Sequence, residues 1–160
     1  MKKYLVFIFI SIIAILSCEK DDICIEPTTP KLIITFYNKD TTYLKKQVKS
    51  LTVWANSKDS LYVNKSLDSI AIPLDVNSEN TLYKFVSTEF ETDTDDQIDT
   101  EDEINFAYNR NDIFISRSCG YKTIYENLTI ESNTENWINS IVINNSTIEN
   151  ETATHIIIFH

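Results

Sequence analysis

The sequence predicts an all-β protein, a two-sheet antiparallel β-sandwich of immunoglobulin-like architecture with eight or nine short strands. Residues 18–160 contain 19 Ile, 6 Val and 17 Thr, against 8 Leu and 4 Ala. Side chains branched at Cβ lose rotamer freedom in a helix and pack well on a pleated surface. Short apolar runs also recur between clusters of Asn, Ser, Thr and Asp, and this spacing is typical of a sandwich.

The predicted strands follow one another with short connections. Leu32, Ile34 and Phe36 fall on one face of the first strand, because successive side chains of a strand point to opposite sides. Pro73 cannot donate to a ladder, which predicts an edge strand or a bulge there. In chain order the segments are 31–37, 48–54, 61–63, 69–75, 82–90, two arms within 103–118, 126–131, 138–144 and 155–159.

Three local features refine this prediction. The poor alternation of residues 82–90 predicts a bulge in that strand. The polar run Asn109-Arg110-Asn111-Asp112 predicts the turn of a hairpin between the two arms of 103–118. Only residues 40–48 and 134–137 leave room for a helical turn.

Residues 1–17 have the organisation of an export signal. Lys2 and Lys3 precede a mostly apolar run that ends at Leu16, and the small residue Ser17 follows. The run is shorter than the roughly 20 residues that a membrane-spanning helix needs. A retained membrane anchor is the alternative interpretation.

The four residues Ile15-Leu16-Ser17-Cys18 resemble a bacterial lipobox. The resemblance implies cleavage before Cys18 and a diacylglycerol on its sulfur, and two or more long chains hold a protein stably at a bilayer. We therefore expect a lipidated tether over residues 18–30 and one sandwich domain over residues 31–160, a length that suits a single domain. Removal of Lys2 and Lys3 would change the formal charge from −10 to −12.

The residues after Cys18 predict where the protein is displayed. Lys20, Asp21 and Asp22 resemble the surface-export signal of Bacteroidota lipoproteins. A solvated tether is also often charged, so an outer-membrane lipoprotein that faces the periplasm is the alternative.

Two cysteines remain once Cys18 carries lipid. An exported chain folds in an oxidising compartment, so we expect a disulfide between Cys24 and Cys119. The closed loop of nearly 100 residues corresponds to about 4 to 5 kcal/mol in the chain-entropy model. A cysteine nucleophile would need a nearby histidine, and only His155 and His160 are present, at the far end of the chain.

Several motifs resemble a family of uncharacterised Bacteroidota lipoproteins, a domain of unknown function. They are the paired Cys18 and Cys24, then Thr29-Pro30, Ile72-Pro73-Leu74 and Ser118-Cys119-Gly120-Tyr121. The resemblance implies a single domain, the disulfide and an envelope location, and it implies no activity. Gly120 is the only glycine and follows a predicted strand, which suggests a positive φ or a close backbone approach.

Composition excludes two large classes of function. One glycine in 160 residues leaves no Gly-rich loop to hold the phosphates of a nucleotide, so we expect no such cofactor. Nucleic acid is not expected as a partner either, because the formal charge is −10 and Arg110 and Arg117 are the only arginines.

Residues 89–103 contain nine of the 24 acidic residues, and we interpret them as a charged loop between strands. A loose calcium site is the alternative, because Asp93, Asp95, Gln97 and Asp99 fall at alternate positions along the chain. An EF-hand is excluded, since Ile98 stands where its sharp turn needs glycine. We assign no metal ligands, and we expect His155 to lie at the surface or the end of a strand.

Other residues could serve modification or contact. Thr41, Ser60 and Ser69 each follow an aspartate and resemble the acceptors of Bacteroidota protein O-glycosylation. Strand aromatics are more often core residues than sugar-stacking residues. Those considered for either role are Tyr37, Trp54, Tyr62, Tyr83 and Trp137.

The sequence therefore predicts a cell-envelope lipoprotein that is not an enzyme and works by binding or scaffolding. Its expected partners are the membrane, through the anchor, and an envelope protein or a glycan. The alternative is a carbohydrate- or ligand-binding module, which would present a row of exposed aromatics on one sheet. An enzyme would instead show buried polar residues that converge in a cleft.

Overall fold

The fold is known from a computed structural model, which describes residues 23–26, 28–41, 44–55, 59–91 and 96–160. These residues form nine strands and no helix, which confirms the all-β prediction. The strands are β1 (Leu32–Tyr37), β2 (Val48–Ala55), β3 (Asp59–Leu67), β4 (Ser69–Ile72), β5 (Asn80–Phe90), β6 (Gln97–Ser116), β7 (Gly120–Asn133), β8 (Ser140–Ile143) and β9 (Ile156–Phe159).

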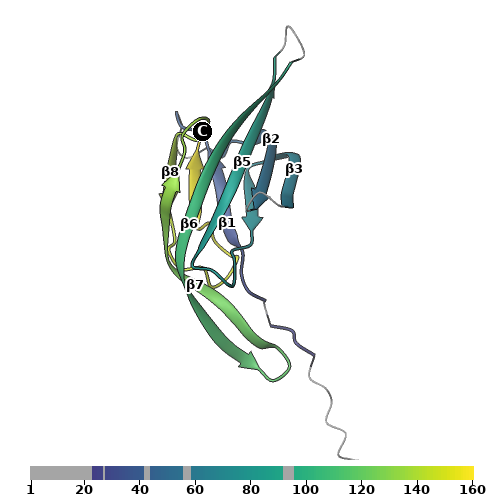
Figure 1. The fold of residues 1–160 in the computed structure, drawn as a ribbon, viewed down its shortest axis with the longest axis vertical. Helices are drawn as coiled ribbons and strands as arrows, with labels where there is room; N and C mark the ends of the chain where they lie inside the picture. The colour runs from purple at the N-terminus through teal and green to yellow at the C-terminus, as the bar shows by residue number, and fades with distance from the viewer. Residues whose placement is uncertain (1–22, 27, 42–43, 56–58, 92–95) are drawn as a thin grey trace, which may run out of the picture.

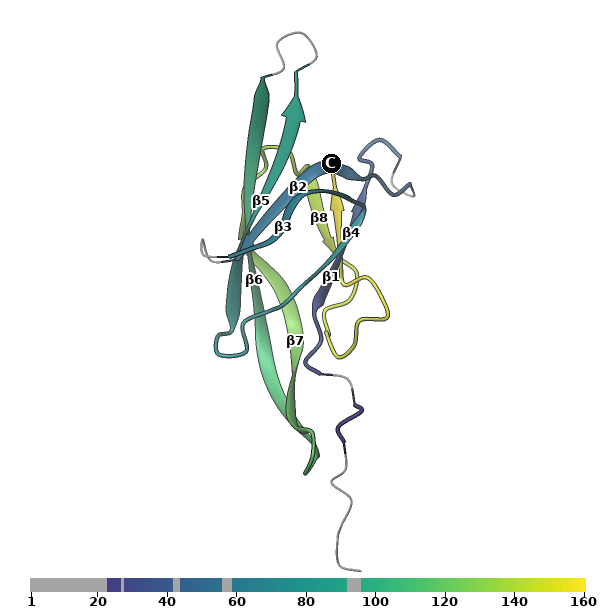
Figure 2. The same cartoon turned by 90° about the vertical axis from the view of Figure 1, so that its right-hand side faces the viewer.

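Two sheets pack face to face as a sandwich (Figures 1 and 2). One has the order β4-β1-β9-β8 and the other the order β3-β2-β5-β6-β7. All neighbouring strands are antiparallel except β1 and β9, which run parallel. The chain thus shares the sandwich architecture of immunoglobulin-like domains, with a strand order of its own.

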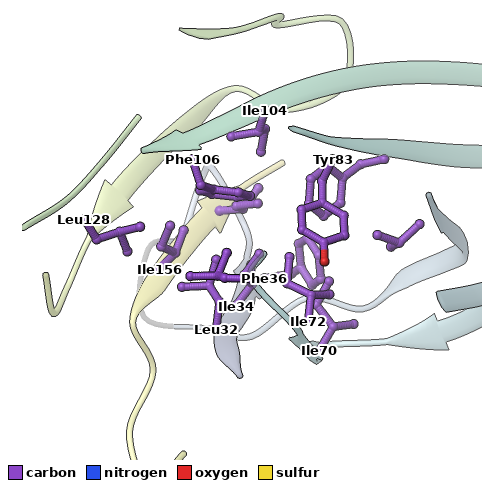
Figure 3. Packing of buried hydrophobic residues seen from close by; sticks show 14 of the residues in the cluster. Leu32, Ile34, Phe36, Ile70, Ile72, Tyr83, Ile104, Phe106, Leu128 and Ile156 are labelled. Carbon is purple, nitrogen blue, oxygen red and sulfur yellow. The ribbon is translucent and has the colours of Figure 1, made fainter. Parts of the chain in front are cut away.

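The core lies between the sheets, and β1 supplies its centre. Leu32, Ile34 and Phe36 share one face of β1, as the alternation predicts, and all three are fully buried. Tyr83 and Phe106 of the five-stranded sheet belong to the same cluster and lie across from β1 (Figure 3). Burial of each such side chain stabilises the fold by roughly 1.5 to 3 kcal/mol.

Two predictions about strand edges and bulges have different outcomes. β4 is an edge strand and ends at Ile72, immediately before Pro73, as the missing N–H of proline requires. The bulge predicted in residues 82–90 is wrong, because β5 pairs without a register shift with both β2 and β6. The sequence of β5 does not show a clear apolar–polar alternation, because the polar Thr81 points inward like Tyr83, while the apolar Leu82 points outward.

The turn predicted at residues 109–112 is also wrong. β6 continues through these residues, where Asn109 pairs with Glu126 and Asp112 pairs with Thr123. Residues 109–112 are polar because this part of β6 is exposed to solvent. The chain reverses instead at residues 117–119, before Gly120 with φ +71°. No atom lies within 4 Å of where a Cβ would stand on Gly120, so the requirement is conformational.

The acidic run is mostly strand and not a loop. β5 ends at Phe90 and β6 begins at Gln97, so Asp99, Glu101 and Glu103 lie on a strand. The two strands pair up to the Phe90–Gln97 pair. This pairing separates the acids onto the two faces of the sheet, and Asp102 is fully buried.

β6 gives the molecule an elongated shape. Its 20 residues correspond to roughly 65 Å of extended chain. The β5–β6 hairpin reaches beyond the sandwich at one end, and the β6–β7 hairpin reaches beyond it at the other (Figure 1). Residues 23–26 and 28–30 lie at the β6–β7 end, and the last strand ends at the opposite side of the sandwich.

Candidate functional site

A disulfide joins the N-terminal tether to the tip of the β6–β7 hairpin. Cys24 and Cys119 are bonded with their Cα atoms 4.9 Å apart, as the sequence predicts. Cys119 lies in the turn of the hairpin, and its backbone N–H donates to Ser116 Oγ at 3.1 Å. The site therefore brings together two segments that are 95 residues apart in the chain.

The tether continues along the free edge of β7. The backbone N–H of Thr123 donates to Thr29 Oγ1 at 3.1 Å, and Thr123 Oγ1 donates to Asp112 Oδ1 at 2.6 Å. β7 is the last strand of its sheet, so this N–H would otherwise point away from the ladder. The disulfide and this hydrogen bond hold Cys24 and Thr29 beside the hairpin.

The hairpin tip and the tether beside it expose apolar side chains. Phe114 and Tyr121 form a cross-strand pair in edge-to-face contact, with ring centroids 5.3 Å apart. They are 55% and 71% exposed, far more than aromatic core residues. Ile23 and Ile25 of the tether are exposed as well.

A second candidate surface lies on the outer face of the five-stranded sheet. It is an open hollow of about 360 Å³ whose lining includes Trp54, Asn64, Asp99 and Glu101. Trp54 is 37% exposed, and an indole beside carboxylates offers both a stacking face and hydrogen-bond acceptors. The hollow is called the Trp54 hollow below.

A bulge in β3 shapes the Trp54 hollow. Val53 lies opposite Tyr62 while Leu51 lies opposite Lys65, so β3 holds one extra residue. Asn64 adopts φ +49° within this bulge, a conformation that asparagine tolerates better than most residues. Its backbone N–H donates to the Thr52 hydroxyl at 3.1 Å, which fixes the side of the hollow.

Each carboxylate of the hollow has polar partners. Hydrogen bonds from Thr88 and Gln97 lower the pKa of Asp99. Glu101 contacts Lys84 Nζ at 2.5 Å, and side-chain hydrogen bonding to Glu101 raises the pKa of Lys84. A general acid for glycoside hydrolysis needs a raised carboxyl pKa. The hydrogen bonds to Asp99 lower its pKa instead.

Buried tyrosines line the opposite face of the same sheet. The hydroxyls of Tyr83 and Tyr125 donate to the carbonyls of Pro73 and Leu74, and that of Tyr108 donates to the Asp75 carbonyl. Burial raises the pKa of Tyr125 to about 12 and also raises the pKa of Tyr83 and of Tyr108. These hydroxyls hold residues 73–75 on the core and remain protonated.

Asp102 is the most deeply buried carboxylate among the described residues, and no sequence pattern predicts its role. It accepts hydrogen bonds from Thr134 Oγ1 at 2.7 Å and from the backbone N–H groups of Asn136, Trp137 and Ile138 at 2.7 to 2.8 Å. Burial alone would raise the pKa of Asp102, but these hydrogen bonds lower it. The carboxylate thus anchors the connection between β7 and β8.

His155 directly precedes β9, which confirms the predicted end-of-strand position, and it is buried rather than at the surface. The Ile33 backbone N–H donates to its Nδ1 at 3.0 Å, and the His155 N–H donates to the Ile33 carbonyl at 3.0 Å. Burial lowers the pKa of His155, and it lowers that of His160, whose ring packs edge-on against Phe36 and Trp137. Both histidines are therefore structural.

The remaining sequence predictions fall on different parts of the molecule. Cys18, Lys20, Asp21 and Asp22 lie outside the described residues, as do two of the proposed calcium ligands, Asp93 and Asp95. Among the described residues, no three His, Cys, Asp or Glu side chains form a cluster that could hold a metal ion. Among the glycosylation candidates Thr41, Ser60 and Ser69, Ser60 is exposed and the other two are half-buried.

The aromatic residues do not form a row on one sheet within the described parts of the chain. Tyr83 is buried, while Tyr37, Tyr62 and Trp137 are partly buried, so Trp54 is the exposed member of the group. In the same described ranges, no helix is long and apolar enough to cross a membrane.

Comparison with known proteins assigns a family. The model of a family of unknown function (DUF6452) matches residues 50–160, more than two thirds of the chain. The chain belongs to this family. No curated protein and no solved structure matches it. The DUF6452 match begins within β2 and includes Trp54, Asp102 and Cys119, whereas Cys24 and β1 precede it.

Proposed function

We propose that this DUF6452 chain is an exported cell-envelope lipoprotein, anchored through Cys18, whose sandwich acts by non-catalytic binding or scaffolding. The observation that carries the proposal is the disulfide between Cys24 and Cys119. Structural disulfides persist in oxidising compartments, which an exported protein enters. Cys18 is then the one cysteine outside this pair, and it directly follows the lipobox-like residues.

The shape of the domain supports a role in contact. Hairpins project from both ends of the sandwich, and the Trp54 hollow leaves the outer face of one sheet accessible. The buried polar groups Asp102 and His155 are saturated by backbone hydrogen bonds and hold connections in place. Sandwich folds serve many unrelated functions through their surfaces, so the partner has to be found by experiment.

Lipidation can be tested directly. Cys18→Ala should abolish labelling by a fatty-acid probe and leave an unprocessed precursor in whole cells. Cys24→Ser is the matched control, because it removes a thiol six residues away and should leave labelling intact. Undiminished labelling of Cys18→Ala would reject the anchor.

Surface display is a separate part of the proposal. Protease added to intact cells should digest the wild-type protein, and alanine at Lys20, Asp21 and Asp22 together should protect it. Protection of the wild type, while a known surface protein is digested, would place the domain on the periplasmic side.

A glycan-binding module is the second candidate, favoured by the exposed indole of Trp54 beside Asp99 and Glu101. In this case Trp54→Ala should abolish retention on a glycan array, whereas Val142→Ala, at an exposed site of the other sheet, should not. A photoreactive residue at position 54 that instead captures one envelope protein reproducibly would support scaffolding. Hydrolysis of a glycan that depends on one carboxylate would overturn both in favour of an enzyme.

A further inference from the structure

We propose that the β6–β7 hairpin tip is a membrane-contacting element that rests on the anionic phospholipid headgroups of the bilayer to which the chain is anchored. The inference rests on the proposed anchor at Cys18 and adds a second, non-covalent lipid contact to it. Its residues are the aromatic pair Phe114 and Tyr121 and the basic side chains Arg117 and Lys122.

The first argument is the distance that the chain can span. Cys18 precedes Cys24 by six residues, and six extended residues reach at most about 20 Å. Cys24 is bonded to Cys119 in the turn of the hairpin. The tip therefore stays within about 20 Å of the lipid-bearing residue, whatever path the intervening chain takes. Without the disulfide, the tether could extend and let the sandwich move away from the bilayer.

The second argument is the chemistry of the tip. Residues 113–123 of the hairpin contain Arg117 and Lys122 and no acidic residue, whereas the acids near the tip, such as Glu26, lie on the tether and the whole chain has a formal charge of −10. Phe114 and Tyr121 are largely exposed beside them, and Ile23 and Ile25 add apolar surface from the tether. Aromatic rings favour the interface between headgroups and acyl chains, and each basic residue near an anionic surface contributes about 1 kcal/mol of attraction.

The third argument is the asymmetry along the long axis. The β5–β6 hairpin, at the opposite end, carries most of the acidic run at residues 89–103 (Figure 1). An anionic bilayer repels that end and attracts the basic tip. Tether, charge and exposed aromatics thus all favour the same orientation, in which β6 stands away from the membrane.

The test uses the full-length chain in cells, with a photoreactive phenylalanine analogue at position 114 or 121. Irradiation should add phospholipid to the protein, detected as incorporated radioactive phosphate and as a lipid mass on the hairpin peptide. The same analogue at Ile98, which is 51% exposed near the other end of β6, is the control and should not capture lipid. Formation of the disulfide on a non-reducing gel verifies that each variant folds.

Charge reversal provides a second measurement. Arg117→Glu combined with Lys122→Glu should lower the lipid crosslinking yield at position 121 by about fivefold for each basic residue, the equivalent of about 1 kcal/mol each. Lys45→Glu combined with Lys49→Glu makes the same change in net charge. Lys45 bridges to Tyr37 at the end of β1 farther from the tether, so this control should leave the yield unchanged.

The outcomes separate this inference from the anchor. Fatty-acid labelling of the same samples reports the anchor, and its absence would overturn the proposed function. Labelled protein that yields no lipid adduct at positions 114 and 121, or that captures a protein there, would overturn the membrane contact alone. Equal lipid capture at Ile98 would also overturn it, because both ends of β6 would then contact the bilayer equally.

Discussion

Replacing Asp102 with asparagine should destabilise the sandwich strongly. The carboxylate is fully buried and accepts four hydrogen bonds, three of them from consecutive backbone N–H groups at Asn136, Trp137 and Ile138. Asp102→Asn keeps one acceptor oxygen and turns an NH₂ group toward the donors that the other oxygen served. Two donors are then unsatisfied in the interior, at a cost of about 1 to 3 kcal/mol each.

The expected loss is therefore about 4 kcal/mol, a large share of the roughly 5 to 15 kcal/mol that holds a typical domain together. With a urea m-value near 2 kcal/mol/M, the unfolding midpoint should fall by about 2 M. The assay is urea unfolding of the purified protein, followed by tryptophan fluorescence. Asp99→Asn, three residues before Asp102 in β6 but on the exposed face, should change the midpoint little.

The pH dependence gives an independent check on Asp102. Its folded-state pKa is lowered, so its stabilising contribution is present above its unfolded pKa of about 3.9 and is lost as the pH falls through the folded-state pKa. The difference between wild type and Asp102→Asn should hence be largest near neutral pH and shrink below about pH 4. A midpoint change under about 0.5 M at pH 7, or a difference independent of pH, would refute the assigned role.

Three further predictions concern the disulfide, a tyrosine and the histidines. Cys24→Ser combined with Cys119→Ser should lower the free energy of unfolding by up to about 4 kcal/mol in urea, and an unchanged midpoint would contradict this. Tyr125→Phe, which leaves a buried carbonyl without its donor, should cost about 1 to 2 kcal/mol by the same assay, whereas a stabilised variant would not fit. The lowered pKa of His155 means that its contribution is complete above its unfolded pKa of about 6.5 and declines as the pH falls through that value toward the folded pKa. His155→Asn should remove this part of the decline between pH 7.5 and 5, and His160→Asn should remove a separate part, because burial lowers the pKa of His160 too. Identical profiles for all three proteins would disprove the assignment.

Much of the fold can be predicted from the sequence, because a strand with one buried face has an apolar residue at every second position. Leu32, Ile34 and Phe36 illustrate this, since each apolar residue of the alternation is in the core. The disulfide could be predicted because the lipobox-like motif left only two cysteines to pair. The position of Gly120 at a positive φ was also predictable, since glycine tolerates that conformation best.

The hairpin turns could not be predicted from residue type. Residues 109–112 are good turn formers, and an exposed strand that leaves the sandwich is polar for the same reason that a turn is. Local composition indicates exposure to solvent, and a turn and a projecting strand are both exposed. The pairing of residues 109–112 with residues 123–126 of β7 distinguishes them, and that pairing follows from a turn further along the chain, at residues 117–119.

Asp102 and His155 show why the sandwich needs a few buried polar side chains. The connection from β7 to β8 is irregular, and Ile33 of β1 precedes the first pair of the β1–β9 ladder, so backbone N–H groups at both places lack ladder partners of their own. An aspartate accepts from three successive N–H groups in the first case, and an imidazole accepts from Ile33 N–H in the second. Residue type alone assigns such side chains to the surface, because aspartate and histidine are usually exposed. Their role comes from the unpaired backbone around them, which exists only once the two sheets have packed.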